Sequence, residues 1–209
     1  MRSLTSYGLP SLLLGSAAWC ALYLARVHYC GHFTYGFLVW NLFLAWVPWA
    51  LALAVEQAVR RDWKALALPL MLGWVLFLPN APYVLTDFVH LRLRSPVPLW
   101  FDVLMLGTAA LTGLLAGAFS LRRIEDSFRG KINPWLLRAG LWSTIVAAGF
   151  GIYLGRFERL NSWDLFVEPS EVLRSLSHLL QPRALVVTLA CAGLLGITYV
   201  GIADRSTPR

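Results

Sequence analysis

The chain has 209 residues, of which 58% are hydrophobic and 14% charged, and its formal net charge is +7. In soluble domains about a quarter of the residues are charged, so this composition excludes an ordinary soluble protein. The basic residues form no patch on a soluble module, and no nucleic-acid partner is expected.

Long runs without a formal charge recur along the chain. Each can hold the roughly 17–25 apolar residues that cross a bilayer as a helix. The pattern predicts an all-α, polytopic membrane helix bundle that forms a single membrane domain over residues 1–209. The six expected transmembrane helices are residues 9–27, 37–55, 64–79, 99–121, 135–155 and 184–202.

The second span carries an amide, Asn41, near one of its ends. An amide inside a membrane needs an interhelical partner, because hydrocarbon offers it no hydrogen bond. We expect that partner to be either Asp87 or Asp102, which lies at the start of the fourth span.

The third span is expected to end at Pro79, because proline blocks the upstream hydrogen bond of a helix. Asn80 then looks like an N-cap, followed by a short amphipathic helix over residues 81–94 at the membrane surface. Polar residues recur there at intervals of three and four, so they share one side of the helix. They are Asn80, Tyr83, Asp87, His90 and Arg94.

Two interpretations of this stripe stay open. The charged residues form either a salt-bridged face that docks the helix or a functional acid/base pair made of Asp87 and His90. Two possible ligands one turn apart do not make a metal site, so no metal is expected. No nucleotide, zinc or dinucleotide motif is present, and no cofactor is expected.

A second polar string follows the fifth span. Arg156 and Arg159 would lie one turn apart if the helix continued, so that both guanidinium groups could converge on one anion. The alternative is that they reach lipid headgroups individually. A second interfacial helix is expected over residues 170–181. The further candidate ligand-binding residues of this string are Glu158, Asn161 and Asp164.

The basic residues are distributed unevenly between the two sides of the predicted membrane. Eleven of the 18 lie on the side of the termini and of the loop after the fourth span. This excess predicts that both termini are cytoplasmic. Both interfacial helices and the polar loops, residues 26–36, 80–98 and 156–183, then lie on the outer face.

Three strings resemble a known family: WNLFLAWVP at residues 40–48, FLPNAPYVLTD at 77–87 and GRFERLNSWD at 155–164. The sequence is similar to a bacterial family of uncharacterised integral membrane proteins, domain-of-unknown-function family 1361. The resemblance implies a polytopic protein of the bacterial cytoplasmic (inner) membrane. It supplies no activity and no catalytic residue.

Three functions are consistent with these features. The first is an outer-face site that binds an anionic, lipid-like ligand, with Asp87 or His90 as acid or base. The second is a non-enzymatic subunit whose outer loops dock a protein partner within a membrane complex. The third is a small transporter with Asp87 and Asp102 in a proton or substrate path. Membrane lipids are the expected partners in each case, and the sequence does not decide whether the protein is an enzyme.

Overall fold

The computed structural model describes residues 5–94, 96–160, 162, 164–167, 169–177 and 181–204. This part of the chain is all-helical, as predicted. Asn161, one of the candidate residues, lies outside it. The helices are α1 (Thr5–Cys30), α2 (Phe37–Arg60), α3 (Lys64–Phe77), α4 (Asn80–Tyr83), η1 (Val84–His90), α5 (Leu99–Phe128), α6 (Pro134–Tyr153), η2 (Leu154–Glu158), α7 (Asp164–Val167), α8 (Pro169–Leu176) and α9 (Pro182–Asp204).

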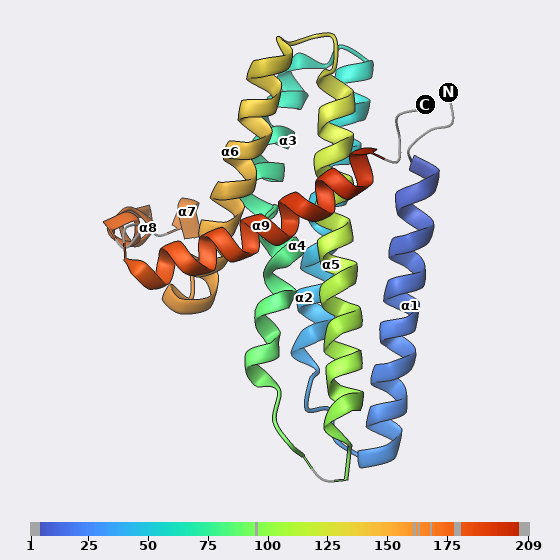
Figure 1. The fold of residues 1–209 in the computed structure, drawn as a ribbon. Helices are drawn as coiled ribbons and strands as arrows, with labels where there is room; N and C mark the ends of the chain where they lie inside the picture. Colours follow the sequence, from blue (N-terminus) through green and yellow to red (C-terminus); the bar gives the residue numbers. More distant parts are fainter. Residues whose placement is uncertain are drawn as a thin grey trace.

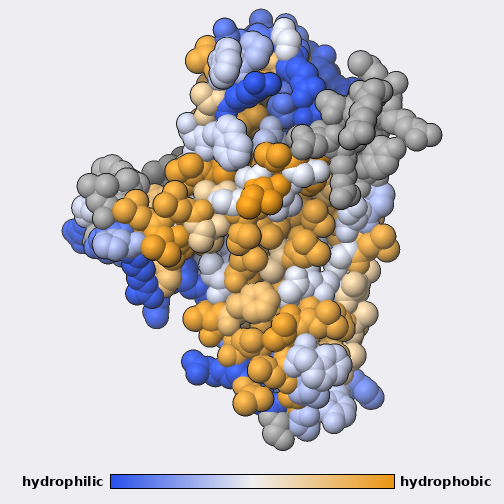
Figure 2. Space-filling model, in the orientation of Figure 1, coloured by the Kyte–Doolittle hydropathy of each residue, from blue (hydrophilic) through white to orange (hydrophobic). Residues whose placement is uncertain are grey.

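Within the described residues, six helical segments are long and apolar enough to cross a membrane, which confirms the predicted number of spans. They are Gly8–Cys30, Phe37–Arg60, Lys64–His90, Leu99–Phe128, Pro134–Glu158 and Pro182–Ile202. Their outward-facing side chains are apolar over the middle of the molecule, and hydrophilic residues gather at its upper end (Figure 2). The chain is therefore built as a multi-pass membrane protein.

The third candidate span corrects a predicted boundary. The α-helix is interrupted at residues 78–79, but the span continues, because Pro79 keeps helical angles of φ −56° and ψ −30° and one candidate span runs from Lys64 to His90. Two carbonyls near the prolines find other donors, because the side-chain amide of Asn80 donates to the Phe77 carbonyl at 3.0 Å and the Ala81 N–H donates to the Leu78 carbonyl at 3.1 Å. Asn80 is the first residue of α4 and not its N-cap, which is Pro79. The helix predicted over residues 81–94 forms the last turns of this span and ends at His90.

The long helix α5 is the centre of the bundle (Figure 1). It runs the length of the molecule with α1 beside it, and α9 crosses it obliquely. Small residues on α5 let its neighbours approach closely. A Cβ atom added at Gly113 would lie 2.3 Å from the Ala81 carbonyl oxygen, so glycine is what allows α4 to pack directly on α5. This contact fixes the position of the polar stripe that follows α4.

The two ends of the bundle differ in their loops. We call the end formed by residues 31–36 and 91–98 the loop end, and the opposite end, with residues 61–63 and 129–133, the terminal end. Large aromatic side chains are exposed near both ends, as in the aromatic belts of membrane proteins. They include Phe33, Trp40 and Trp100 near the loop end and Trp63 and Trp135 near the terminal end.

Candidate functional site

The side chain of Arg156 joins the two polar strings that the sequence singled out. It extends from η2, in the fifth candidate span, to η1, in the third. Its Nη2 donates to Asp87 Oδ1 at 2.6 Å, its Nε donates to Thr86 Oγ1 at 2.9 Å, and its Nη1 lies 3.2 Å from His90 Nε2. The guanidinium carbon also lies over the Tyr83 ring, 5.0 Å from its centre.

These contacts leave the Asp87 side chain buried. Its side chain is 1% exposed, and its second carboxylate oxygen accepts a hydrogen bond from Asn41 Nδ2 at 2.8 Å. Of the two partners expected for Asn41, the structure selects Asp87. Both oxygens of this carboxylate are thus used, one by a cation and one by an amide, which compensates much of the cost of burying it.

The local backbone explains why these residues meet. Residues 84–90 form a 3-10 helix, in which residues three apart lie on the same side. Asp87 and His90 are therefore aligned, and both face Arg156. The stripe ends there, because Leu91 takes an extended conformation with ψ of 120°. The last predicted member, Arg94, lies instead with its guanidinium carbon 5.2 Å from the centre of the Tyr35 ring.

The expected convergence of Arg156 and Arg159 does not occur. Arg156 lies in a π-helical segment, which turns less per residue than an α-helix, so the two side chains are not one turn apart. Arg159 follows the segment in a left-handed conformation, with φ of 59° and ψ of 27°, and its side chain is exposed. Within the described ranges it makes no ion pair.

The other described candidates of the second string lie at the end of η2 and at the start of α7. Glu158 accepts a hydrogen bond from the Tyr153 hydroxyl at 3.3 Å. Asn80 donates to Ser162 Oγ at 2.9 Å and so ties the third span to the loop after η2. Asp164 begins α7.

Asp102 belongs to a second ion pair. Arg26 holds it with two contacts, Nε to Oδ1 at 2.7 Å and Nη2 to Oδ2 at 3.2 Å, and both side chains are 1% exposed. The pair joins the end of α1 to the start of α5. Arg26 was not among the predicted site residues. The sequence signal for Arg26 is its position between two long uncharged runs. The sequence does not indicate its partner, which is 76 residues away.

Tyr35 connects the two ion pairs and was also missed by sequence reasoning. Its hydroxyl donates to the His90 carbonyl at 3.4 Å, and its ring lies 4.7 Å from the guanidinium carbon of Arg26. Tyr35 is buried, and this burial raises the pKa of its phenol, which therefore stays protonated and able to donate.

A third charged network lies toward the terminal end. Arg123 on α5 bonds to Glu56 on α2, Arg122 holds Glu125 at 2.9 Å, and the Tyr199 hydroxyl of α9 donates to Glu125 at 2.6 Å. These contacts fasten three candidate spans together. The network contains none of the predicted site residues.

The chemistry of the Asp87–Arg156 centre follows from its hydrogen bonds. A guanidinium group can only donate, so the contact between Arg156 and His90 is a hydrogen bond in the tautomer whose Nε2 is the acceptor. Asp87 has no free oxygen for a substrate. No three potential metal ligands of the His, Cys, Asp or Glu type gather anywhere in the part of the chain that is described. The arrangement is a charge-compensated network to which side chains of three candidate spans contribute.

These features define an all-helical, multi-pass membrane protein with two ion pairs buried toward one end of its bundle. The chain belongs to a family of proteins of unknown function, DUF1361, whose family model matches residues 40–198. The matched region contains Asn41, Asp87 and Arg156, whereas Arg26 and Tyr35 precede it. Neither the curated proteins nor the solved structures contain a match to the chain.

Replacing Arg156 tests this geometry. Arg156→Gln leaves the buried Asp87 carboxylate without its cation, and we expect the free energy of unfolding to fall by about 3–5 kcal/mol. Arg159→Gln is the matched control, because it removes an exposed arginine three residues away and is expected to change stability by less than about 0.5 kcal/mol. Unfolding of the purified variants in detergent provides the measurement. Equal effects of the two substitutions would contradict the assigned role of Arg156.

Proposed function

We propose that the protein is a multi-pass protein of the bacterial cytoplasmic membrane that binds an anionic, lipid-like ligand at its loop end. The proposal is one of binding and includes no catalytic step. The ligand class is the one that the sequence favours, but the arginine proposed to hold the ligand is not one of the predicted pair, Arg156 and Arg159. The way in which the buried carboxylates pair with the arginines supports the proposal.

Arg156 is a poor group for holding a ligand. Its three nitrogen atoms already contact Thr86, His90 and Asp87, and its side chain is only 16% exposed. An anion would have to displace Asp87, and this would leave a buried carboxylate without its cation. The cost of that exchange argues against the pair of arginines that the sequence suggested.

The cation that carries the proposal is Arg94. Asp102 and Asp87 are already neutralised by Arg26 and Arg156, and no carboxylate within the described ranges lies within ion-pair distance of Arg94. Its guanidinium group stacks on the Tyr35 ring, which also contacts Arg26. A guanidinium group held over an aromatic ring keeps its N–H groups free to bind a phosphate or a carboxylate.

The level of these residues in the bundle favours a lipid-like ligand. Arg26 lies in the last turns of the first candidate span, and Arg94 lies in the connection just beyond the third. Exposed aromatic side chains, Phe33 and Trp100 among them, surround this end and are typical of the headgroup region. An anionic headgroup would therefore reach Arg94 from the membrane interface. A transport path through Asp87 and Asp102 is less favoured, because each carboxylate is held by its own arginine.

Binding of a defined lipid tests the proposal. We expect Arg94→Gln to weaken the binding of an anionic phospholipid roughly tenfold to a hundredfold, the usual effect of losing a charged hydrogen-bonding partner. Arg92→Gln is the matched control, because Arg92 is an exposed arginine of the same connection. Native mass spectrometry of the detergent-solubilised protein would measure both variants against a zwitterionic lipid. Equal binding by the Arg94→Gln and Arg92→Gln variants would contradict the proposal, as would an equal preference of the wild type for both lipids.

The excess of basic residues at the terminal end supports an orientation with both termini in the cytoplasm and the loop end outside. Cys30 reports on this orientation, because it ends α1 at the loop end and is only half-buried. Cys20 faces outward within α1, where lipid would surround it, and Cys191 is buried.

We expect a membrane-impermeant thiol reagent added to intact cells to label Cys30 and to leave the other two cysteines unlabelled. A Cys30→Ser variant is the control for assignment of the signal. Labelling of Cys30 in inverted membrane vesicles but not in intact cells would show the opposite orientation.

A further inference from the structure

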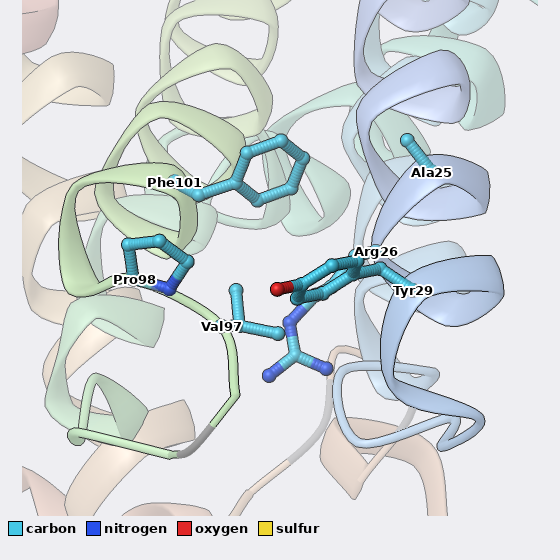
Figure 3. A pocket seen from close by; sticks show the side chains of 6 residues that line it. All are labelled: Ala25, Arg26, Tyr29, Val97, Pro98 and Phe101. Atoms are coloured by element: carbon cyan, nitrogen blue, oxygen red, sulfur yellow. The ribbon is translucent and has the colours of Figure 1, made fainter.

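A cavity of about 300 Å³ lies between the end of α1 and the start of α5. Figure 3 shows Arg26 and Tyr29 extending from α1 toward Val97 and Pro98 on the opposite wall. Ala25 and Phe101 complete the lining. The cavity is adjacent to the Arg26–Asp102 ion pair but contains none of the residues of the Asp87–Arg156 centre.

The walls of the cavity are held in place by contacts that do not involve a ligand. The bidentate contact between Arg26 and Asp102 fixes the distance between α1 and α5 beside it. On the other wall, the Val97 N–H donates to the Arg94 carbonyl at 3.0 Å, and this turn leads through Pro98 into α5. The same turn that positions Arg94 on Tyr35 thus also forms one wall of the cavity.

The chemistry of the lining is that of an amphiphile site. Five of the six lining side chains are aliphatic or aromatic, and the single charged one is Arg26. Two nitrogens of Arg26 bind Asp102, and its third contacts only the Cys30 sulfur at 3.5 Å, which is a weak interaction. Because Arg26 is 1% exposed and neutralised by Asp102, the lining suits the apolar part of an amphiphile whose anionic part lies at Arg94.

We propose that this cavity is the acyl-chain subsite of the anionic-ligand site, so that the ligand is an amphiphile with its headgroup at Arg94 and one chain between α1 and α5. The inference rests on the proposed function and specifies its ligand. A volume of about 300 Å³ is at the lower limit of small-molecule pockets. It accommodates a segment of one chain and excludes a second. The remainder of the ligand stays in the surrounding lipid.

The test compares alkyl phosphates of increasing chain length with inorganic phosphate. Ala25→Phe places a ring in the cavity, whereas Ala21→Phe, one helical turn earlier on the same helix, adds the same ring to an exposed position outside the lining. Native mass spectrometry would measure the binding of each probe to the wild type, both alanine variants and Arg94→Gln. Partition of the probes into detergent is the same for all four proteins and cancels in the affinity ratios.

We expect the ratio of wild-type to Ala25→Phe affinity to rise with chain length, by up to about fourfold for each methylene that the cavity buries, and then to level off. Ala21→Phe should bind as the wild type does, and inorganic phosphate should bind both alanine variants equally. An alkyl phosphate with a photoreactive group at the chain end should label residues 25–29 and 97–101.

Two outcomes separate the inference from the proposal on which it rests. If Ala25→Phe binds every alkyl phosphate as tightly as the wild type does, while Arg94→Gln still weakens them, the acyl-chain subsite is wrong and the anionic site stands. If inorganic phosphate binds as tightly as the longest alkyl phosphate, the ligand is a soluble anion and the subsite is again wrong. If Arg94→Gln changes nothing, both proposals fail.

Discussion

The ion pair between Asp87 and Arg156 is the interaction on which the arrangement of the polar residues depends. It joins two candidate spans far apart in the sequence, and Asn41 adds a third span by binding the other carboxylate oxygen. Close backbone packing brings the partners within reach, since a Cβ atom at Gly151 would lie 2.6 Å from the Pro79 ring. Charges at this depth are expensive unless they are paired, so the pair both requires the packing and stabilises it.

The pairing also determines which arginines remain for a ligand. Each buried aspartate of this part of the bundle neutralises one arginine. Asp87 pairs with Arg156, and Asp102 pairs with Arg26. Arg94 comes after the 3-10 segment has ended, so it leaves the Asp87 stripe and stacks on Tyr35. The turn from Arg94 to Val97 then forms one wall of the cavity, so Arg94 lies three residues before the lining residue Val97. Neutral pairs inside and a cation at the rim that has no ion pair among the described residues support the proposed anionic headgroup at the interface.

The spans were predictable because hydropathy and length decide them. The need of a buried amide for a partner limited Asn41 to Asp87 or Asp102, and only the packing selects Asp87. The continuation through Pro79 was not predictable in the same way. The sequence shows the lost N–H groups, but the compensating donation from the Asn80 side chain depends on its rotamer. The separation of Arg156 and Arg159 depends on a π-helical turn and a left-handed residue, which spacing alone does not encode. Arg26 and Asp102 meet only through the packing of α1 on α5.

A double-mutant cycle on Asp87 and Arg156 tests the central claim most directly. Unfolding in detergent would be compared for the wild type, Asp87→Asn, Arg156→Gln and the variant that carries both changes. If the two groups compensate each other, the double variant is more stable than Arg156→Gln alone, with a coupling energy of about 2 kcal/mol or more. Additive effects, with coupling below about 0.5 kcal/mol, would contradict the claim that this pair holds the spans together.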